Sequence, residues 1–218
     1  RYNDFVGSDR HRFNDAVESF GNFDKDGGFN RDADIYGNFM AFCNDDCIEL
    51  DGGQRNVRCF DNRFESSLVG ISIQGCMTSP SFVFNNVLSG LGDPFNRAGF
   101  GIKTGSGEHG SEAKTYIFEN YFARKTNGIN MMNTLEAHVT NNIFAKGVTI
   151  SSVDESPQSV IKSNLMNLNL NDEDLPDIYP IRPVPFVLSR QKITNPGGEF
   201  TVTIKPLPEM VKEIPFKI

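Results

Sequence analysis

The chain has 218 residues, with 21 Lys and Arg against 28 Asp and Glu, and a formal net charge of −7. This acidic balance argues against a nucleic-acid-binding protein, because neutralising phosphates requires a basic surface. Hydrophobic residues make up 38% of the chain, enough for a folded core. No apolar run reaches the ~18 residues of a membrane span.

A repeat runs through most of the chain. Its unit is an apolar residue, two variable positions, Asn, any residue and a large apolar residue, and its copies centre on Asn38, Asn62, Asn86, Asn120, Asn142 and Asn164. The flanking apolar columns are Ile35, Cys59, Val83, Ile117, Val139 and Ile161 before the Asn, and Met40, Phe64, Leu88, Phe122, Phe144 and Met166 after it. The successive spacings of 24, 24, 34, 22 and 22 residues fit coils of three short strands. Stacked coils predict an all-β fold, a right-handed parallel β-helix, with the Asn amides stacked in a ladder.

A second apolar column marks another strand of each coil. Its members are Val17, Ile48, Ile71, Ile102, Ile129 and Val148. Because neighbouring residues of a strand face opposite sides, their successors face outward, and these are Glu18, Glu49, Ser72, Lys103, Asn130 and Thr149. This polar stripe is either a groove for a linear polar polymer or a solvated sheet face. A β-sandwich is the weaker alternative, since sandwich strands do not repeat one Asn at a fixed phase.

The two ends of the chain differ from its middle. The first recognisable coil begins near Asn14, with little before it to cover an open strand edge. We therefore expect further coils or a cap N-terminal to Arg1, or a second chain, so that this sequence is the C-terminal portion of a longer β-helix. Coils are predicted over residues 1–175. Residues 176–218 are rich in Pro and read as a cap, with one alternating strand at 199–204.

Loops longer than the coil requires point to a functional region. The longest coil has extra residues at 89–99 and 105–110, on both sides of Lys103, so Arg97 and His109 are expected beside Lys103. A second long loop, at 24–34, has acidic residues at alternate positions but lacks the closing Glu of a calcium-binding loop. Calcium is thus the one cofactor left open, and no metal ligands are assigned.

Acidic residues align between neighbouring coils. Asp15 is predicted one coil from Asp46, and Glu18 one coil from Glu49. Carboxylates so placed raise each other's pKa, so that one acts as an acid and its neighbour as a base, as glycoside hydrolysis requires. A cation site and simple exposure are the alternatives. The catalytic candidates are Asp15, Asp45, Asp46, Glu49 and Lys103, and the substrate-binding candidates are Glu18, Ser72, Arg97, His109 and Asn130.

Three strand segments resemble motifs of a known family. Residues 45–48 (Asp-Asp-Cys-Ile), 70–73 (Gly-Ile-Ser-Ile) and 102–104 (Ile-Lys-Thr) resemble the D-D-C, G-H-G-I-S and R-I-K motifs of polygalacturonases, in that order, and 13–15 stands in the place of N-T-D. Val69 and Gly101 stand where that family has His and Arg. More broadly, the chain resembles the pectate-lyase-like β-helix proteins that act on carbohydrates.

The resemblance implies a secreted, periplasmic or cell-surface enzyme that cleaves an anionic, uronate-containing polysaccharide. In a glycoside hydrolase, Asp15, Asp45 and Asp46 would be the acid and base carboxylates, and Lys103 would hold a substrate carboxylate. In a polysaccharide lyase, Lys103 would instead be the base that abstracts a proton. The third possibility is a non-catalytic β-helix that binds glycan or has a structural role.

Overall fold

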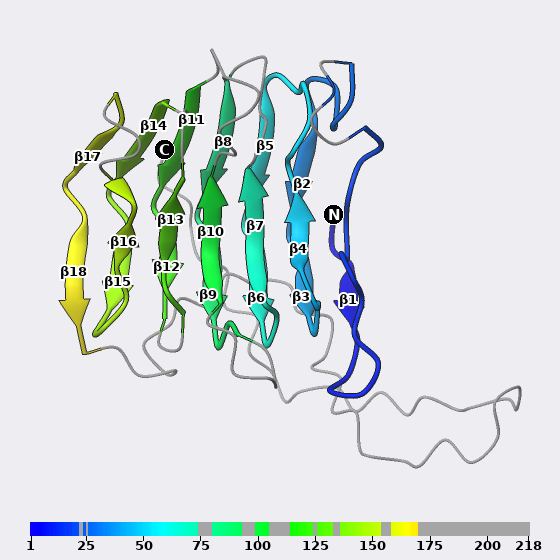
Figure 1. Cartoon of the computed structure of the whole chain (residues 1–218), viewed down its shortest axis with the longest axis horizontal. Helices are drawn as coiled ribbons and strands as arrows, with labels where there is room; N and C mark the ends of the chain where they lie inside the picture. The colour runs from blue at the N-terminus through cyan, green and yellow to red at the C-terminus, as the bar shows by residue number, and fades with distance from the viewer. Residues whose placement is uncertain are drawn as a thin grey trace, which may run out of the picture. The chain divides into compact units, whose positions relative to one another are not determined.

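The computed structural model describes residues 1–21, 24, 26–73, 80–92, 99–104, 114–123, 126–132, 136–153 and 158–169. These residues form short strands in three sheets, all paired in parallel, and no helix (Figure 1). The first sheet holds, in spatial order, β1 (Asp4–Val6), β3 (Phe39–Ala41), β6 (Arg63–Glu65), β9 (Val87–Ser89), β12 (Tyr121–Phe122), β15 (Ile143–Ala145) and β18 (Leu165–Leu168). The second holds β16 (Ile150–Ser151), β13 (Ile129–Met131), β10 (Phe100–Thr104), β7 (Val69–Ile73) and β4 (Asp46–Glu49). The third holds β17 (Val160–Lys162), β14 (Glu136–Thr140), β11 (Lys114–Phe118), β8 (Ser81–Phe84), β5 (Val57–Phe60) and β2 (Asp34–Tyr36).

The chain visits the three sheets in a fixed rotation. After β1, successive strands enter the third, first and second sheets in turn, and each strand pairs with its counterpart one coil away. This arrangement is a β-solenoid, so the predicted parallel β-helix is confirmed. The predicted cap at 176–218 and its strand at 199–204 lie outside the described residues.

The Asn ladder occupies the turn between the third and first sheets. The side-chain nitrogen of each member donates to the side-chain oxygen of the next, at 2.9 Å from Asn38 to Asn62, 3.1 Å from Asn62 to Asn86, 2.9 Å from Asn86 to Asn120, 3.0 Å from Asn120 to Asn142 and 3.0 Å from Asn142 to Asn164. The residue before each ladder Asn has a left-handed backbone, with φ between 52° and 66°. The ladder therefore supplies the hydrogen bonds that the buried polar groups of this turn require.

The ladder and the first coil begin earlier than the sequence predicts. Asn3 donates to the Asn38 side chain at 3.3 Å, and β1 pairs with β3. The expected start near Asn14 is therefore wrong. Asn3 was missed because the repeat places an apolar residue three positions before each Asn, and the sequence has no such position before Asn3.

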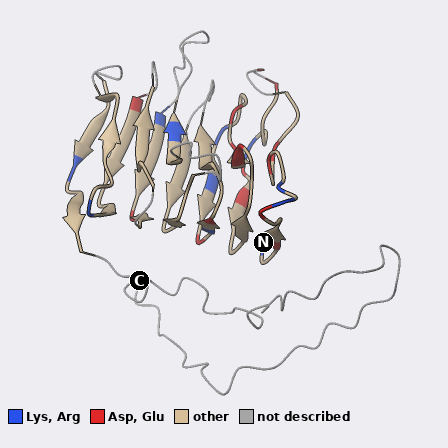
Figure 2. Cartoon of the chain, turned by 60° about the horizontal axis from the view of Figure 1, so that its bottom comes forward, with Lys and Arg blue, Asp and Glu red and all other residues tan. Residues whose placement is uncertain are grey.

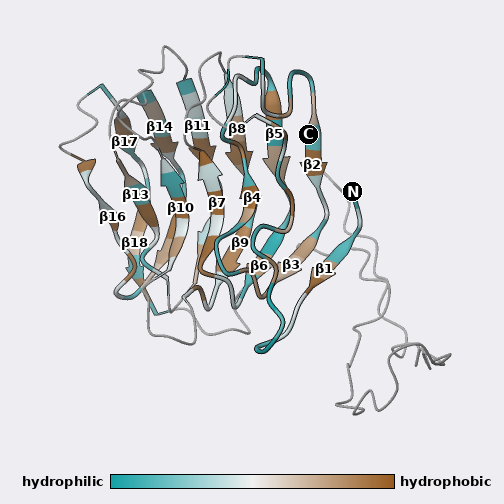
Figure 3. Ribbon diagram, turned by 45° about the vertical axis from the view of Figure 1, so that its right-hand side comes forward, coloured by the Kyte–Doolittle hydropathy of each residue, from teal (hydrophilic) through white to brown (hydrophobic). Residues whose placement is uncertain are grey.

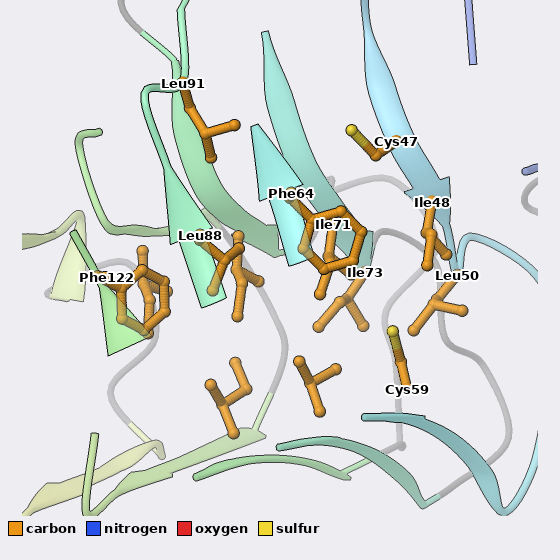
Figure 4. Close-up of a cluster of buried hydrophobic side chains, with 14 of the residues drawn as sticks. Cys47, Ile48, Leu50, Cys59, Phe64, Ile71, Ile73, Leu88, Leu91 and Phe122 are labelled. Atoms are coloured by element: carbon orange, nitrogen blue, oxygen red, sulfur yellow. The ribbon is translucent and has the colours of Figure 1, made fainter. Parts of the chain in front are cut away.

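The apolar columns face the interior between the sheets. Phe64, Phe122 and Phe144 are among the largest fully buried side chains, and the rings of Phe122 and Phe144 stack at 4.6 Å. Figure 4 shows Phe64 and Phe122 in the cluster of buried hydrophobic side chains, and Figure 3 shows hydrophobic residues along the strands. Cys59 is a buried core residue, as predicted; Cys43 and Cys47 are also buried, and all three are free thiols. The columns become exposed at the last described coil, where Ile161, Leu165 and Met166 lie on edge strands.

One column assignment is wrong. Ile150, and not Val148, pairs with Ile129 in the second sheet, so the outward residue of that coil is Ser151 and not Thr149. The cause is a tight turn in which the Val148 amide donates to the Ala145 carbonyl at 3.1 Å. Val148 is buried beside that turn instead of pairing in the sheet.

Candidate functional site

The outward face of the second sheet carries a ladder of polar side chains. Glu49, Ser72, Lys103, Asn130 and Ser151 lie in register on successive strands. Val17 forms a bridge with Ile48, which sets Glu18 beside Glu49 at one end of the ladder. The predicted polar stripe is therefore present from Glu18 to Asn130.

The N-terminal end of this ladder is strongly acidic. Carboxylate oxygens approach within 4.8 Å of one another in three groups: Asp15, Asp45 and Asp46; Asp15, Glu18 and Glu49; and Asp46, Glu49 and Asp51. We call these six residues the acidic cluster; Figure 2 shows acidic residues on the coils near the N-terminal end. Asp51 was missed in the sequence. The signal was its position two residues after Glu49, which places both on the same face of an extended segment.

Asp46 lies at the centre of the cluster and is fully buried. Its Oδ2 lies 2.8 Å from the ammonium nitrogen of Lys103, while its Oδ1 has no hydrogen-bond partner. The Asp46 backbone amide donates to Asp15 Oδ1 at 2.9 Å. Asp45 Oδ1 lies 3.7 Å from the same Lys103 nitrogen. Lys103 thus bridges two strands of the ladder to reach both aspartates.

Ser72 fills the coil between Glu49 and Lys103. It is fully buried, and its hydroxyl lies 2.8 and 2.9 Å from the two carboxylate oxygens of Asp51. Because the Ser72 side chain has no exposed surface, the structure does not place it where it could touch a polymer directly, and its substrate contact stays a prediction.

The surroundings of Asp46 change its acidity. Burial raises the pKa of Asp46 to about 8 and outweighs the attraction of Lys103, while Asp45 and Asp51 raise it further. Burial lowers the pKa of Lys103, but the carboxylates of Asp46, Asp45 and Asp51 outweigh that effect and raise it above its ordinary value. Near neutral pH the site therefore holds the charged ammonium of Lys103 beside an Asp46 carboxyl group that is largely protonated.

The side chains of the site differ in their exposure to solvent. The side chain of Asp45 is 51% exposed and that of Lys103 20% exposed, whereas Asp46 is covered. Asn130 lies one strand beyond Lys103, where its Oδ1 accepts a hydrogen bond from Ser151 at 3.2 Å. The structure therefore brings Asp15, Glu18, Asp45, Asp46, Glu49, Ser72, Lys103 and Asn130 together along one face, with Asn130 in register beside Lys103. Arg97 and His109 lie outside the described residues.

The acidic cluster also has the chemistry of a cation site. Carboxylate oxygens are the ligands that Ca²⁺ and Mg²⁺ prefer, and the buried Oδ1 of Asp46 has a free lone pair. Glu49 and Asp51 would supply the neighbouring oxygens. Among the described residues, no group of three metal-ligating side chains includes one from 24–34, so the acids of that loop do not converge.

A separate cavity of about 340 Å³ lies along the same solenoid, lined by Leu91, Gly99, Thr126, Asn127 and residues 146–148. It contains none of the predicted site residues. The chemistry therefore concentrates at the acidic cluster and not in this cavity.

Comparison with protein-family models, curated proteins and solved structures finds no match to this chain. Within the described part of the chain, no helix has the length and apolar character needed to cross a membrane. A β-solenoid is compatible with carbohydrate-active β-helix proteins, but fold alone does not assign a reaction. The functional argument therefore rests on the acidic cluster.

Proposed function

We propose that this protein is a secreted or cell-surface glycoside hydrolase that cleaves a uronate-containing polysaccharide at the acidic cluster. The observation that supports it is the convergence of Asp15, Asp45 and Asp46 within 4.8 Å, beside the ammonium of Lys103. Glycoside hydrolysis needs one carboxyl group that donates a proton to the leaving oxygen and a second that acts as base or nucleophile. The pKa of about 8 means that Asp46 still carries a proton near neutral pH.

Burial separates the roles of these carboxyl groups. Asp46 is covered and cannot touch a polymer, whereas the Asp45 side chain is half exposed. In this proposal Asp45 and Asp15 are the catalytic residues. Asp46 is a positioning residue that exchanges a proton with Asp45, directly or through one water, and Lys103 holds both aspartates.

The charge of the site limits how a uronate chain could lie. The acidic cluster holds six carboxylates and one ammonium lies beside it, so full ionisation would leave an excess of five negative charges (six minus one). Beyond Lys103 the ladder continues with Asn130 and Ser151 and carries no further acid. We therefore place the anionic groups of the substrate along this neutral half, with the bond to be cleaved beside Asp45.

The state of Lys103 favours hydrolysis over elimination. A lyase base must be a neutral amine, but the raised pKa of Lys103 keeps its ammonium charged. The second candidate is a β-helix that binds uronate through a divalent cation held by the acidic cluster. The buried Oδ1 of Asp46, which has no hydrogen-bond partner, favours that candidate.

A cleavage assay with two readouts separates these candidates. The full chain is incubated with uronate-rich and neutral polysaccharides, and new reducing ends and the ultraviolet absorbance of unsaturated uronate are both recorded. Reducing ends without absorbance support the proposal, and both signals together identify a lyase instead. Neither signal, with calcium-dependent glycan binding, supports the second candidate. Asp45→Asn, purified in the same way, controls for contaminating activity.

A further inference from the structure

Cys43 and Cys47 lie at the two ends of the short segment that carries Asp45 and Asp46. Both thiols are free and fully buried, and both belong to the core between the sheets, where Figure 4 shows Cys47. The two thiol groups are hydrogen-bonded to each other, and the Ser67 hydroxyl contacts both. The proposed function uses neither thiol, so this pair needs an explanation of its own.

The neighbouring coils hold this segment from both sides. On one side, the Asn44 amide donates to the Phe13 carbonyl at 2.7 Å. On the other side, the Cys43 amide donates to the Ser67 hydroxyl at 2.9 Å. The fold therefore keeps the two thiols side by side, which is the condition for a covalent bond between them.

We propose that Cys43 and Cys47 form a disulfide bond when the chain folds in the presence of a small disulfide such as oxidised glutathione, and that this bond closes a loop around Asp45 and Asp46. The secreted or cell-surface location given under the proposed function would supply the oxidising environment, and only this point rests on that function. The bond would then fix the segment from which both aspartates enter the acidic cluster.

The oxidation proceeds by two exchange steps. One cysteine thiolate attacks the small disulfide and displaces its first thiol, and the second cysteine thiolate attacks the resulting mixed disulfide and displaces the other thiol. One S–S bond and two S–H bonds break, and one S–S bond forms in the protein. The two protons end on the two released thiols, so the protein is oxidised and the small disulfide is reduced.

Refolding in a glutathione buffer tests the bond, because the buried thiols are reached by the oxidant before the core closes. The reduced full chain is unfolded in urea, refolded in about 1 mM each of reduced and oxidised glutathione, alkylated and digested with trypsin. Both cysteines fall in one tryptic peptide, 32–55, whereas Cys59 and Cys76 fall in two others. We expect peptide 32–55 to be unalkylated and two hydrogen atoms lighter than its reduced form. Alkylation of this peptide, or its attachment to Cys59, Cys76 or glutathione, would overturn the proposal.

A comparison with the unfolded chain shows whether the fold builds this site. In the same buffer with about 8 M urea, the neighbouring coils no longer hold the segment. The ratio of oxidised to reduced peptide 32–55 is expected to be at least about tenfold higher in the folded chain. Equal ratios would mean that closeness in sequence alone pairs the thiols, and the proposal fails.

Cys59→Ser is the matched control, since Cys59 is equally buried but lies on β5, away from the pair. This variant should keep the mass loss in peptide 32–55, and Cys47→Ser should abolish it; loss of the bond in Cys59→Ser contradicts the assignment. The readout is a mass and not an activity. An absence of polysaccharide cleavage would therefore refute the proposed function and leave this result unchanged.

Discussion

Replacing one member of the Asn ladder measures what the ladder contributes to stability. Asn86 is fully buried, and its side-chain nitrogen donates to Asn120 Oδ1 at 2.9 Å and to the carbonyls of Cys59 and Phe84 at 3.0 Å each. Its oxygen accepts from the backbone and side-chain nitrogens of Asn62, at 3.0 and 3.1 Å. Asn86→Ala removes all of these hydrogen bonds.

The expected cost follows from the groups left behind. A buried donor or acceptor that loses its partner costs about 1–3 kcal/mol, and some of the orphaned groups keep a second partner. We therefore expect Asn86→Ala to lower the free energy of unfolding by about 3–5 kcal/mol, a large share of the roughly 5–15 kcal/mol of an ordinary domain. Urea unfolding followed by circular dichroism measures it.

Asn130→Ala is the control for this experiment. Asn130 is half-buried on an outward face and accepts one side-chain hydrogen bond, from Ser151. Its loss should cost no more than about 1 kcal/mol. If Asn86→Ala and Asn130→Ala destabilise the protein equally, the ladder is not a major source of stability and the reasoning fails.

Three further predictions concern the acidic cluster and the backbone. Because the folded-state pKa of Asp46 is raised to about 8, the native state keeps a proton that the unfolded chain has lost, so stability falls as the pH rises from about 4 to 8. Asp46→Asn should flatten that fall in urea titrations with a chelator present; an unchanged slope contradicts the pKa. Added Ca²⁺ should raise the melting temperature of the wild type at pH 8 more than that of Asp51→Asn, and equal shifts would place the cation elsewhere. Gly70→Ala should cost about 1–3 kcal/mol, since its Cβ would lie 2.6 Å from the Gly101 carbonyl oxygen. Gly147→Asn, in a left-handed position with open space, should cost far less, and equal melting temperatures would refute the steric argument.

The fold could be predicted because the ladder Asn recur at nearly constant spacing. Each ladder residue satisfies buried groups of its neighbours, so the same residue type is needed in every coil. Val148 was misplaced because the turn length varies between coils, and an apolar residue fits equally well in the turn or in the strand. Local turn geometry, and not hydrophobic pattern, decides such positions.

The sequence contains an outward column of stacked aromatic rings on the third sheet that the sequence analysis did not predict. Tyr36, Phe60, Phe84 and Phe118 each stand two residues before a ladder Asn, at a position that the repeat treats as variable. Aromatic residues are also common in protein cores, so the sequence alone does not show that these residues face outward. The register of the third sheet shows it. Outward aromatic columns of this kind are therefore harder to predict than the core.

The alignment of Asp15 with Asp46 predicted that acids from neighbouring coils would meet. The sequence did not indicate that Asp46 is fully buried and paired with Lys103, two strands away in the second sheet. A long side chain reaches across coils in a direction that strand periodicity does not specify. Only the structure shows that Asp46 is covered whereas Asp45 is exposed.

The most direct test of the account is the turnover of Asp45→Asn on the polysaccharide that the wild type cleaves, with Glu119→Gln as an exposed acidic control outside the cluster. Removing a catalytic carboxyl group should lower the turnover number by about 10²–10⁴-fold while the circular dichroism spectrum stays unchanged. Glu119→Gln should retain the wild-type rate. A folded Asp45→Asn variant that cleaves within about twofold of the wild type contradicts the claim that the acidic cluster is the active site.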